Sequence, residues 1–256
     1  MKIHVEQVEA MDAGARLDFH HELSAHLHTF SPGLCKTLTP GALLAIVREG
    51  VARAEAYGLT YRGPARLFLE LTLLLGWGFD RDAQYPWAIE TLSRDDFENQ
   101  MFKAGRLEHL ARTYVEAVQG SRGEHATRAM LALEALAERG EVQFYRPHLD
   151  RQILRAIDEV FPTKLAFVGE EAVKALVDRA ERLSAEVFGG DDPRTVAILT
   201  ILEVAFGMYF DTDPLYPWIS TTLRDPRIRD PKHRAERLER RAIIWLRAVN
   251  ASVRTA

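Results

Sequence analysis

Apolar residues recur along most of the chain at the three- and four-residue spacing of amphipathic helices. The clearest case follows Thr39 and Pro40, which are typical of the cap and first position of a helix, and it ends at Gly58, a typical helix end. Residues 173–189 repeat this pattern and also end on a glycine. The pattern therefore predicts an all-α fold of roughly ten helices with little or no sheet.

Two further segments, 65–76 and 196–207, are apolar on nearly every side, which predicts central core helices. Both are shorter than the roughly 20 apolar residues that a membrane span requires. Each carries one glutamate, Glu70 or Glu203, and the two glutamates do not coincide when the segments are aligned. We therefore expect a partly exposed edge on each helix and no shared buried catalytic acid.

One block of seventeen residues occurs twice, as GWGFDRDAQYPWAIETL at 76–92 and as GMYFDTDPLYPWISTTL at 207–223. The shift between the copies is 131 residues, from Phe79 to Phe210, and it needs no gap between about residue 23 and about residue 118. A block repeated at a fixed period indicates one structural unit built twice.

The repeat predicts two tandem pseudo-repeats of four to five helices each, packed as one helical bundle or as a short superhelix. We expect the first helical repeat over 1–120 and the second over 146–256. Between them, 121–145 should hold a connecting helix, because its helical pattern has no counterpart elsewhere in the chain.

Composition adds few constraints on function. Cys35 is the single cysteine, so no internal disulfide can form, and the opening residues carry acids where a secretory signal would be apolar. These features predict a cytoplasmic protein without a membrane segment. Nothing in the sequence indicates a cofactor, and the oligomeric state stays open.

Charge is segregated along the chain. From Arg224 onward there are ten Arg/Lys and four Asp/Glu, a net charge of +6, so the rest of the chain carries −10 of the total of −4. A basic final helix can bind an acidic protein, and its candidate contact residues are Arg234, Arg237, Arg240 and Arg241. Nucleic-acid binding is the least favoured use of this helix, because no aromatic residues are interleaved and the remaining chain is acidic.

The repeated block contains two aspartate pairs, Asp80 with Asp82 and Asp211 with Asp213. Asp-x-Asp loops can bind hard cations such as Ca²⁺ or Mg²⁺ through carboxylate oxygens. The spacing does not continue as a calcium loop of the EF-hand type would, and Leu215 stands where a further ligand is needed.

A structural role explains more of the repeated block. Aspartate side chains accept backbone N–H groups in turns, Tyr-Pro favours the start of a helix, and tryptophan anchors that helix in the core. We therefore favour a structural loop over a metal site. The residues of this structural motif are Phe79, Asp80, Asp82, Pro86 and Trp87, and Phe210, Asp211, Asp213, Pro217 and Trp218.

Four histidines lie between residues 20 and 28, and histidine clusters are candidate metal ligands. Their spacing does not match the zincin pattern, in which two histidines are four residues apart and a glutamate follows the first. Asp18, Glu22 and His26 do share one helical face, so they form a second candidate metal site. Histidines exposed on a helix surface are the simpler interpretation.

The repeated block and its surroundings resemble small helical proteins from bacterial loci for type VI secretion and polymorphic toxins. The matching segments are FSP at 30–32, IVREGVARA at 46–54, YG at 57–58, FDRDAQYPWA at 79–88, FP at 161–162 and FDTDPLYPW at 210–218. Ala83 stands where the family pattern has a proline. The resemblance implies a role beside a secreted toxin, as an immunity protein, adaptor or accessory chaperone, and it implies no catalytic residues.

We therefore expect a non-enzymatic binding protein that acts on a bacterial toxin, effector or secretion-system component. No phosphate-binding glycine loop, serine nucleophile elbow or paired-cysteine motif supports an enzyme. The alternative is a protein that binds a metal or small ligand, with or without hydrolytic activity, using the Asp-x-Asp loops or the histidine-rich first helix.

Overall fold

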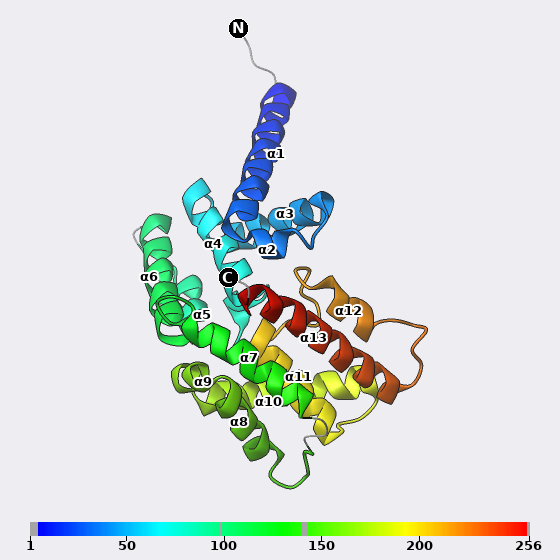
Figure 1. The fold of residues 1–256 in the computed structure, drawn as a ribbon. Coiled ribbons are helices and arrows are strands. Elements are labelled where there is room, and N and C mark those ends of the chain that lie inside the picture. The colour runs from blue at the N-terminus through cyan, green and yellow to red at the C-terminus, as the bar shows by residue number, and fades with distance from the viewer. Residues whose placement is uncertain (1–4, 98, 140–142, 255–256) are drawn as a thin grey trace. The chain divides into compact units, whose positions relative to one another are not determined.

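The computed structural model describes residues 5–97, 99–139 and 143–254 (Figure 1). Within these ranges the regular elements are thirteen α-helices and one 3₁₀ turn, with no strand. The all-α prediction is confirmed. None of the described helices has the long, nearly uncharged apolar stretch that crossing a bilayer requires.

The chain divides into two compact units. Unit 1 comprises residues 1–75 and 91–108, and unit 2 comprises 76–90 and 109–256. This division does not follow the two sequence copies, because the first repeated block lies mostly in unit 2. The helical repeats expected over 1–120 and 146–256 stay a prediction.

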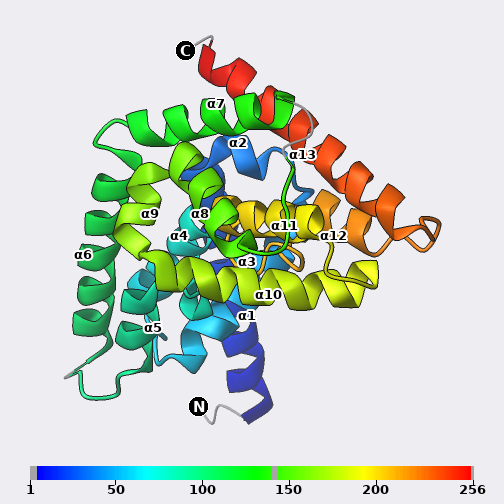
Figure 2. The same cartoon turned by 90° about the horizontal axis from the view of Figure 1, so that it is seen from below.

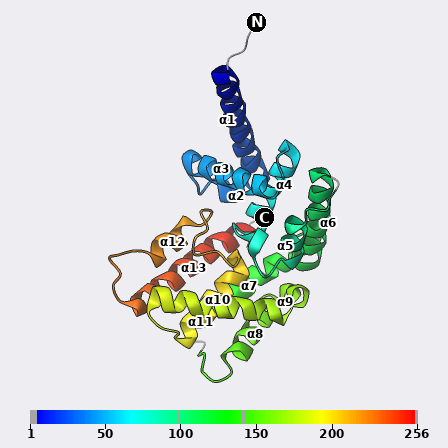
Figure 3. The same ribbon diagram turned by 180° about the vertical axis from the view of Figure 1, so that it is seen from behind.

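Unit 1 contains the first four helices and parts of two more. They are α1 (Val5–Phe30), α2 (Pro32–Cys35), α3 (Pro40–Ala56) and α4 (Arg62–Leu75), with parts of α5 (Pro86–Ser93) and α6 (Gln100–Gln119), which also extend into unit 2. Helix α1 packs against α3 and α4 (Figure 3). A Cβ at Gly50 would lie 2.3 Å from Leu69 Cδ2, so this glycine lets α3 and α4 approach closely.

The ends of α3 follow the local sequence signals. The backbone N–H of Ala42 donates to Thr39 Oγ1 at 3.2 Å, and Pro40 is the first residue of the helix. Gly58 follows the helix with a φ of 76°, which a glycine adopts without steric cost. Both predicted ends are confirmed. Helix α1 begins at Val5 and ends at Phe30.

Unit 2 contains the remaining elements. They are the 3₁₀ turn η1 (Phe79–Arg81), α7 (Glu124–Glu138), α8 (Leu149–Val160), α9 (Pro162–Val168), α10 (Glu170–Phe188), α11 (Pro193–Phe206), α12 (Pro217–Leu223) and α13 (Pro231–Arg254). Helices α10 and α11 lie side by side (Figure 2), as do α7 and α13. Their apolar faces share one core that extends from Ala129 to Leu246.

The two core helices differ at their glutamates. Glu70 in α4 is partly exposed, as predicted, with 20% of its side chain accessible. Glu203 in α11 is fully buried, and the partly exposed edge of that helix is formed by Ile198, Ile201 and Ala205. The burial of Glu203 has a tertiary reason: Arg179 of the neighbouring helix α10 pairs with this carboxylate, which lets a charged group lie inside the core.

Candidate functional site

The two copies of the repeated block meet in unit 2, and we call their contact, formed by residues 76–85 and 207–216, the loop junction. Asp82 Oδ2 accepts the backbone N–H of Met208 at 2.7 Å. Asp213 Oδ2 accepts the backbone N–H of Trp77 at 3.2 Å. The donors Trp77 and Met208 are 131 residues apart, and so are the acceptors Asp82 and Asp213. Each block therefore makes the same hydrogen bond to the other.

The second oxygen of each aspartate stays within its own loop. Asp82 Oδ1 accepts the backbone N–H of Gln84 at 2.9 Å, and Asp213 Oδ1 accepts that of Leu215 at 2.7 Å. These are turns in which an aspartate side chain binds the backbone two residues on. Each carboxylate therefore stabilises its own turn with one oxygen and the opposite loop with the other.

Glycines allow the loops to approach closely. A Cβ at Gly76, whose φ is 104°, would lie 2.5 Å from the backbone oxygen of Phe206. At Gly78 a Cβ would lie 2.2 Å from Tyr209 Cδ2. A side chain at either position would displace the opposite loop, which explains why the junction needs glycine at these points.

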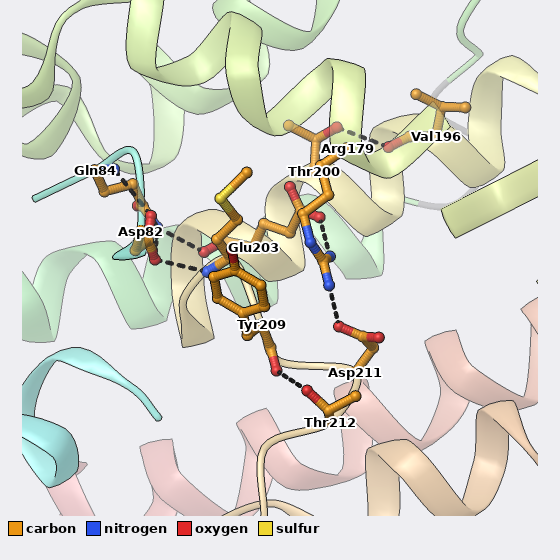
Figure 4. A network of polar contacts seen from close by, with 10 residues as sticks. Asp82, Gln84, Arg179, Val196, Thr200, Glu203, Tyr209, Asp211 and Thr212 are labelled. Carbon is orange, nitrogen blue, oxygen red and sulfur yellow. Dashed lines mark hydrogen bonds and ion pairs between the residues drawn. The ribbon is translucent and has the colours of Figure 1, made fainter. Parts of the chain in front are cut away.

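Gln84 extends the junction toward α11 (Figure 4). Its Nε2 donates to Asp82 Oδ2 at 3.0 Å and to the backbone oxygen of Glu203 at 3.0 Å. Asp82 is almost completely buried. Burial raises the pKa of its carboxyl, although the N–H groups of Met208 and Gln84 act in the opposite direction.

A partly buried arginine connects α10, α11 and the second loop (Figure 4). Arg179 Nη1 donates to Glu203 Oε1 at 2.7 Å, and its Nη2 donates to Asp211. The guanidinium carbon also lies 5.0 Å from the ring centroid of Tyr209, a cation–π distance. Burial raises the pKa of the Glu203 carboxyl more than Arg179 lowers it.

A buried lysine borders the same region. Lys164 Nζ donates to the backbone oxygen of Val204 at 2.5 Å and lies 5.8 Å from the ring centroid of Tyr85. Burial lowers the pKa of Lys164 to about 8, partly opposed by the carboxylate of Asp82. The rings of Tyr85 and Tyr114 meet edge to face at 5.3 Å, and burial raises the pKa of both phenols.

The aromatic residues of the repeated block hold the helices that follow. Phe79 and Phe210 are fully buried, and α5 and α12 begin at Pro86 and Pro217, as predicted. The partly buried Trp218 has its ring centroid 6.3 Å from that of Phe206. Trp87 is likewise half-buried, with its ring 6.1 Å from that of Tyr85. The block thus turns the chain and anchors the next helix.

The candidate metal ligands of the two Asp-x-Asp loops, Asp82 and Asp213, bind N–H groups of the protein. In the described part of the chain, no group of three or more His, Cys, Asp or Glu side chains is arranged to hold a metal ion. Both oxygens of Asp82 and of Asp213 accept N–H groups, while Asp80 and Asp211 are buried. Metal binding by these loops stays a prediction.

The histidine-rich helix pairs with α4 of unit 1. His26 Nε2 lies 2.6 Å from Glu70 Oε1, and Arg62 Nη1 donates to Glu22 Oε2 at 2.5 Å. Asp18 is exposed on the same helix. The three residues expected on one face therefore include two that contact α4 and one that faces solvent.

The four candidate arginines of α13 fall into two pairs. Arg234 Nη1 donates to the backbone oxygen of Val187 at 2.7 Å, and Arg241 Nη1 donates to Thr222 Oγ1 at 2.6 Å. These two arginines are partly buried and connect α13 to its neighbours. Arg237 and Arg240 are exposed.

A cavity of about 700 Å³ lies between α10, α11 and α13 in unit 2. Its lining mixes apolar side chains such as Phe188 and Ile198 with charged ones such as Lys232 and Glu236. Arg194 and Glu239 form an ion pair at its wall, with 2.7 Å between Nη2 and Oε1. This mixture of charges identifies no particular ligand.

Sequence reasoning missed Arg179 and Lys164. One signal for Arg179 was present, because the 131-residue shift aligns it with Arg48 of the first copy. Lys164 aligns with Gly33 and carried no such signal.

No protein family matches the chain, and neither a curated protein nor a solved structure is significantly similar to it.

Proposed function

We propose that this protein is a non-enzymatic helical binding protein that acts on a bacterial toxin or secretion-system component. Its role would be that of an immunity protein, an adaptor or an accessory chaperone in the cytoplasm. The resemblance of the repeated block to proteins of such loci motivates the choice of partner. The physical support comes from how the charged groups of that block are used.

The observation that carries the proposal is the reciprocal pairing of Asp82 with Met208 and of Asp213 with Trp77. These carboxylates have the spacing of a cation site, yet all four of their oxygens accept N–H groups of the protein itself. Arg179 similarly binds Glu203 and Asp211. The charged groups of the repeated block therefore stabilise the fold. We accordingly assign the proposed binding to the exposed surfaces of the helices.

The same pairing supports the proposal that the two copies are related structural units. Residues 131 positions apart make equivalent hydrogen bonds to each other's loop, as expected for two copies facing one another. A duplicated helical scaffold of this kind offers extended side-chain surfaces suited to protein partners.

Co-expression with the product of the adjacent gene tests the proposed function. We expect a complex that survives size-exclusion chromatography and, where that product is toxic, restored growth of the host cells. The control is an unrelated toxin expressed in the same way, which should neither bind nor be neutralised. Absence of both a complex and neutralisation would overturn the proposal.

A further inference from the structure

The solvent-exposed face of α13 carries a straight row of basic residues with an isoleucine among them. We call this row the α13 stripe. Its members are His233, Arg237, Arg240, Ile244 and Arg247, at successive spacings of four, three, four and three residues. All five are exposed, and Ile244 is 60% accessible. Such spacing places side chains on one face of a helix.

The stripe lies opposite the buried face of the same helix. Leu238, Ala242 and Leu246 point into the core of unit 2, whereas all five side chains of the α13 stripe are exposed. The exposure of Ile244 is therefore not a consequence of a poorly buried helix. It is an apolar position within an otherwise basic surface.

Two of the four basic side chains of the stripe, Arg237 and Arg240, form no salt bridge with another residue in the described ranges, although Arg227 and Arg237 together lower the pKa of the Asp225 carboxyl. His233 Nδ1 lies 3.2 Å from Asp230 Oδ2, and both of these side chains are more than half exposed. Arg247 reaches Glu138 of α7 at 2.9 Å, but both side chains are about half exposed. Exposed pairs of this kind contribute little and exchange readily for another carboxylate.

We propose that the α13 stripe binds an acidic amphipathic helix of a protein partner. Carboxylates of that helix would pair with Arg237 and Arg240, and one of its apolar side chains would cover Ile244. The stripe from His233 to Arg247 is about 21 Å long at 1.5 Å per residue, which is roughly four turns of a partner helix. The inference rests on the proposed function, because it names the kind of protein that is bound and the surface that binds it.

Ile244 favours a protein over a phosphate polymer, and the net charge of −4 of the whole chain disfavours an anionic membrane. A phosphate backbone offers nothing apolar to an exposed isoleucine, whereas a partner side chain would remove it from water. The segment from residue 224 onward has a net charge of +6 while the rest of the chain has −10. A short acidic helix can bind to the local basic surface, but a long polyanion or a charged bilayer would also meet the acidic remainder.

A synthetic helical peptide tests the proposal without requiring the natural partner. The probe is a fluorescein-labelled peptide of about 18 residues with glutamates flanking leucines along one face. Fluorescence anisotropy measures its binding to the full chain, to R237E/R240E and to I244A. The matched control is R155E/R182E, which makes the same charge change at exposed positions of α8 and α10. Circular dichroism verifies that each variant is folded.

We expect saturable binding by the wild type that weakens as salt increases. Affinity should fall about tenfold or more in R237E/R240E and several-fold in I244A, while R155E/R182E should stay within about twofold of the wild type. A probe with glutamine in place of glutamate should bind more weakly.

Two outcomes would overturn the proposal. One is absence of peptide binding, or binding that the stripe variants leave unchanged. The other is binding of a DNA duplex, or of phosphatidylserine-containing vesicles, that the stripe variants abolish although the peptide does not bind. If either occurs while the adjacent gene product still forms a complex, the proposed function holds and only this surface is wrong.

Discussion

Asp82 Oδ2 lies 2.7 Å from the backbone nitrogen of Met208, a residue 126 positions later in the chain. With the mirrored bond between Asp213 and Trp77, this contact makes each repeated loop supply the acceptor that the other loop needs. The stability of one loop therefore depends on side chains of the other.

Replacing Asp82 with alanine should destabilise the protein. The backbone N–H groups of Gln84 and Met208 would lose their acceptor, and each buried donor left unpaired costs about 1–3 kcal/mol. Asp213→Ala should have a comparable effect, because it removes the equivalent pair. Urea denaturation measures both changes. Asp178→Ala, an exposed position in α10, is the control, and a loss as small as the control's would contradict the junction described here.

Removing the guanidinium of Arg179 should have a larger effect, because both of its carboxylate partners are buried. Arg179→Met leaves Glu203 and Asp211 inside the protein without their cation, which costs about 3–5 kcal/mol. Arg179→Lys should recover only part of the loss, because an ammonium lacks the planar fork that reaches both carboxylates. The matched control is Arg182→Met, an exposed position on the same helix, expected within about 0.5 kcal/mol of the wild type. Equal thermal melting of the two methionine variants would refute this role of Arg179.

Lys164 should make stability depend on alkaline pH. Burial lowers its pKa from the usual 10.5 to about 8, so between these values the unfolded chain binds more protons than the folded one. The free energy of unfolding should therefore rise with pH in this interval, by roughly 3 kcal/mol in total. Below pH 8 the lysine is charged in both states, and its contribution no longer changes.

The measurement is urea denaturation at successive values from pH 7 to about pH 9. Above this range tyrosines of the unfolded chain ionise near their ordinary pKa of about 10, whereas burial raises the pKa of Tyr85 in the folded protein, so their ionisation would lower the free energy of unfolding. Lys164→Met should abolish the rise, and Lys174→Met, at an exposed position, should retain it. A rise that persists in Lys164→Met would assign the effect to another group.

Two glycines should respond in opposite ways to alanine. Gly76→Ala places a methyl group 2.5 Å from the Phe206 oxygen at a φ of 104°, so we expect a loss of more than about 2 kcal/mol. Gly105→Ala places its methyl group in open space within α6 and should stabilise the protein by about 0.4–1 kcal/mol. Thermal unfolding of the two variants checks the contrast, which equal melting temperatures would disprove.

Protein purified without a histidine tag should contain no stoichiometric calcium, magnesium or zinc. The oxygens of Asp82 and Asp213 are engaged by N–H donors, and His26 contacts Glu70. Elemental analysis by mass spectrometry measures the metal content. Stoichiometric metal that disappears in Asp80→Ala or His26→Ala would reverse the preference for a structural loop. Melting of Asp82→Ala should be the same with and without a chelator.

Local signals predicted the ends of helices well. The Thr39 cap, the left-handed Gly58 and the helix starts at Pro86 and Pro217 each depend on interactions within a few residues, which the sequence displays directly. The apolar stripes likewise predicted the all-α class, because helical periodicity belongs to each segment by itself.

Pairings between distant segments could not be predicted in this way. The burial of Glu203 could not be predicted from its own helix, because its partner Arg179 lies on another helix. The two aspartate turns were predicted, but the contact of Asp82 with Met208 was not, since periodicity does not specify which loops meet. The aligned arginines, Arg48 and Arg179, show that a repeat can point to such residues before their partners are known.

Because both loops belong to one polypeptide, their contact can lose its symmetry by mutation. In a dimer of identical chains, every substitution would appear on both sides at once. Here Gln84 and Leu215 occupy equivalent positions, yet Gln84 donates to the backbone of α11 while Leu215 is a buried apolar residue. The difference between these two residues therefore gives the first loop a polar connection to α11 that has no equivalent at Leu215.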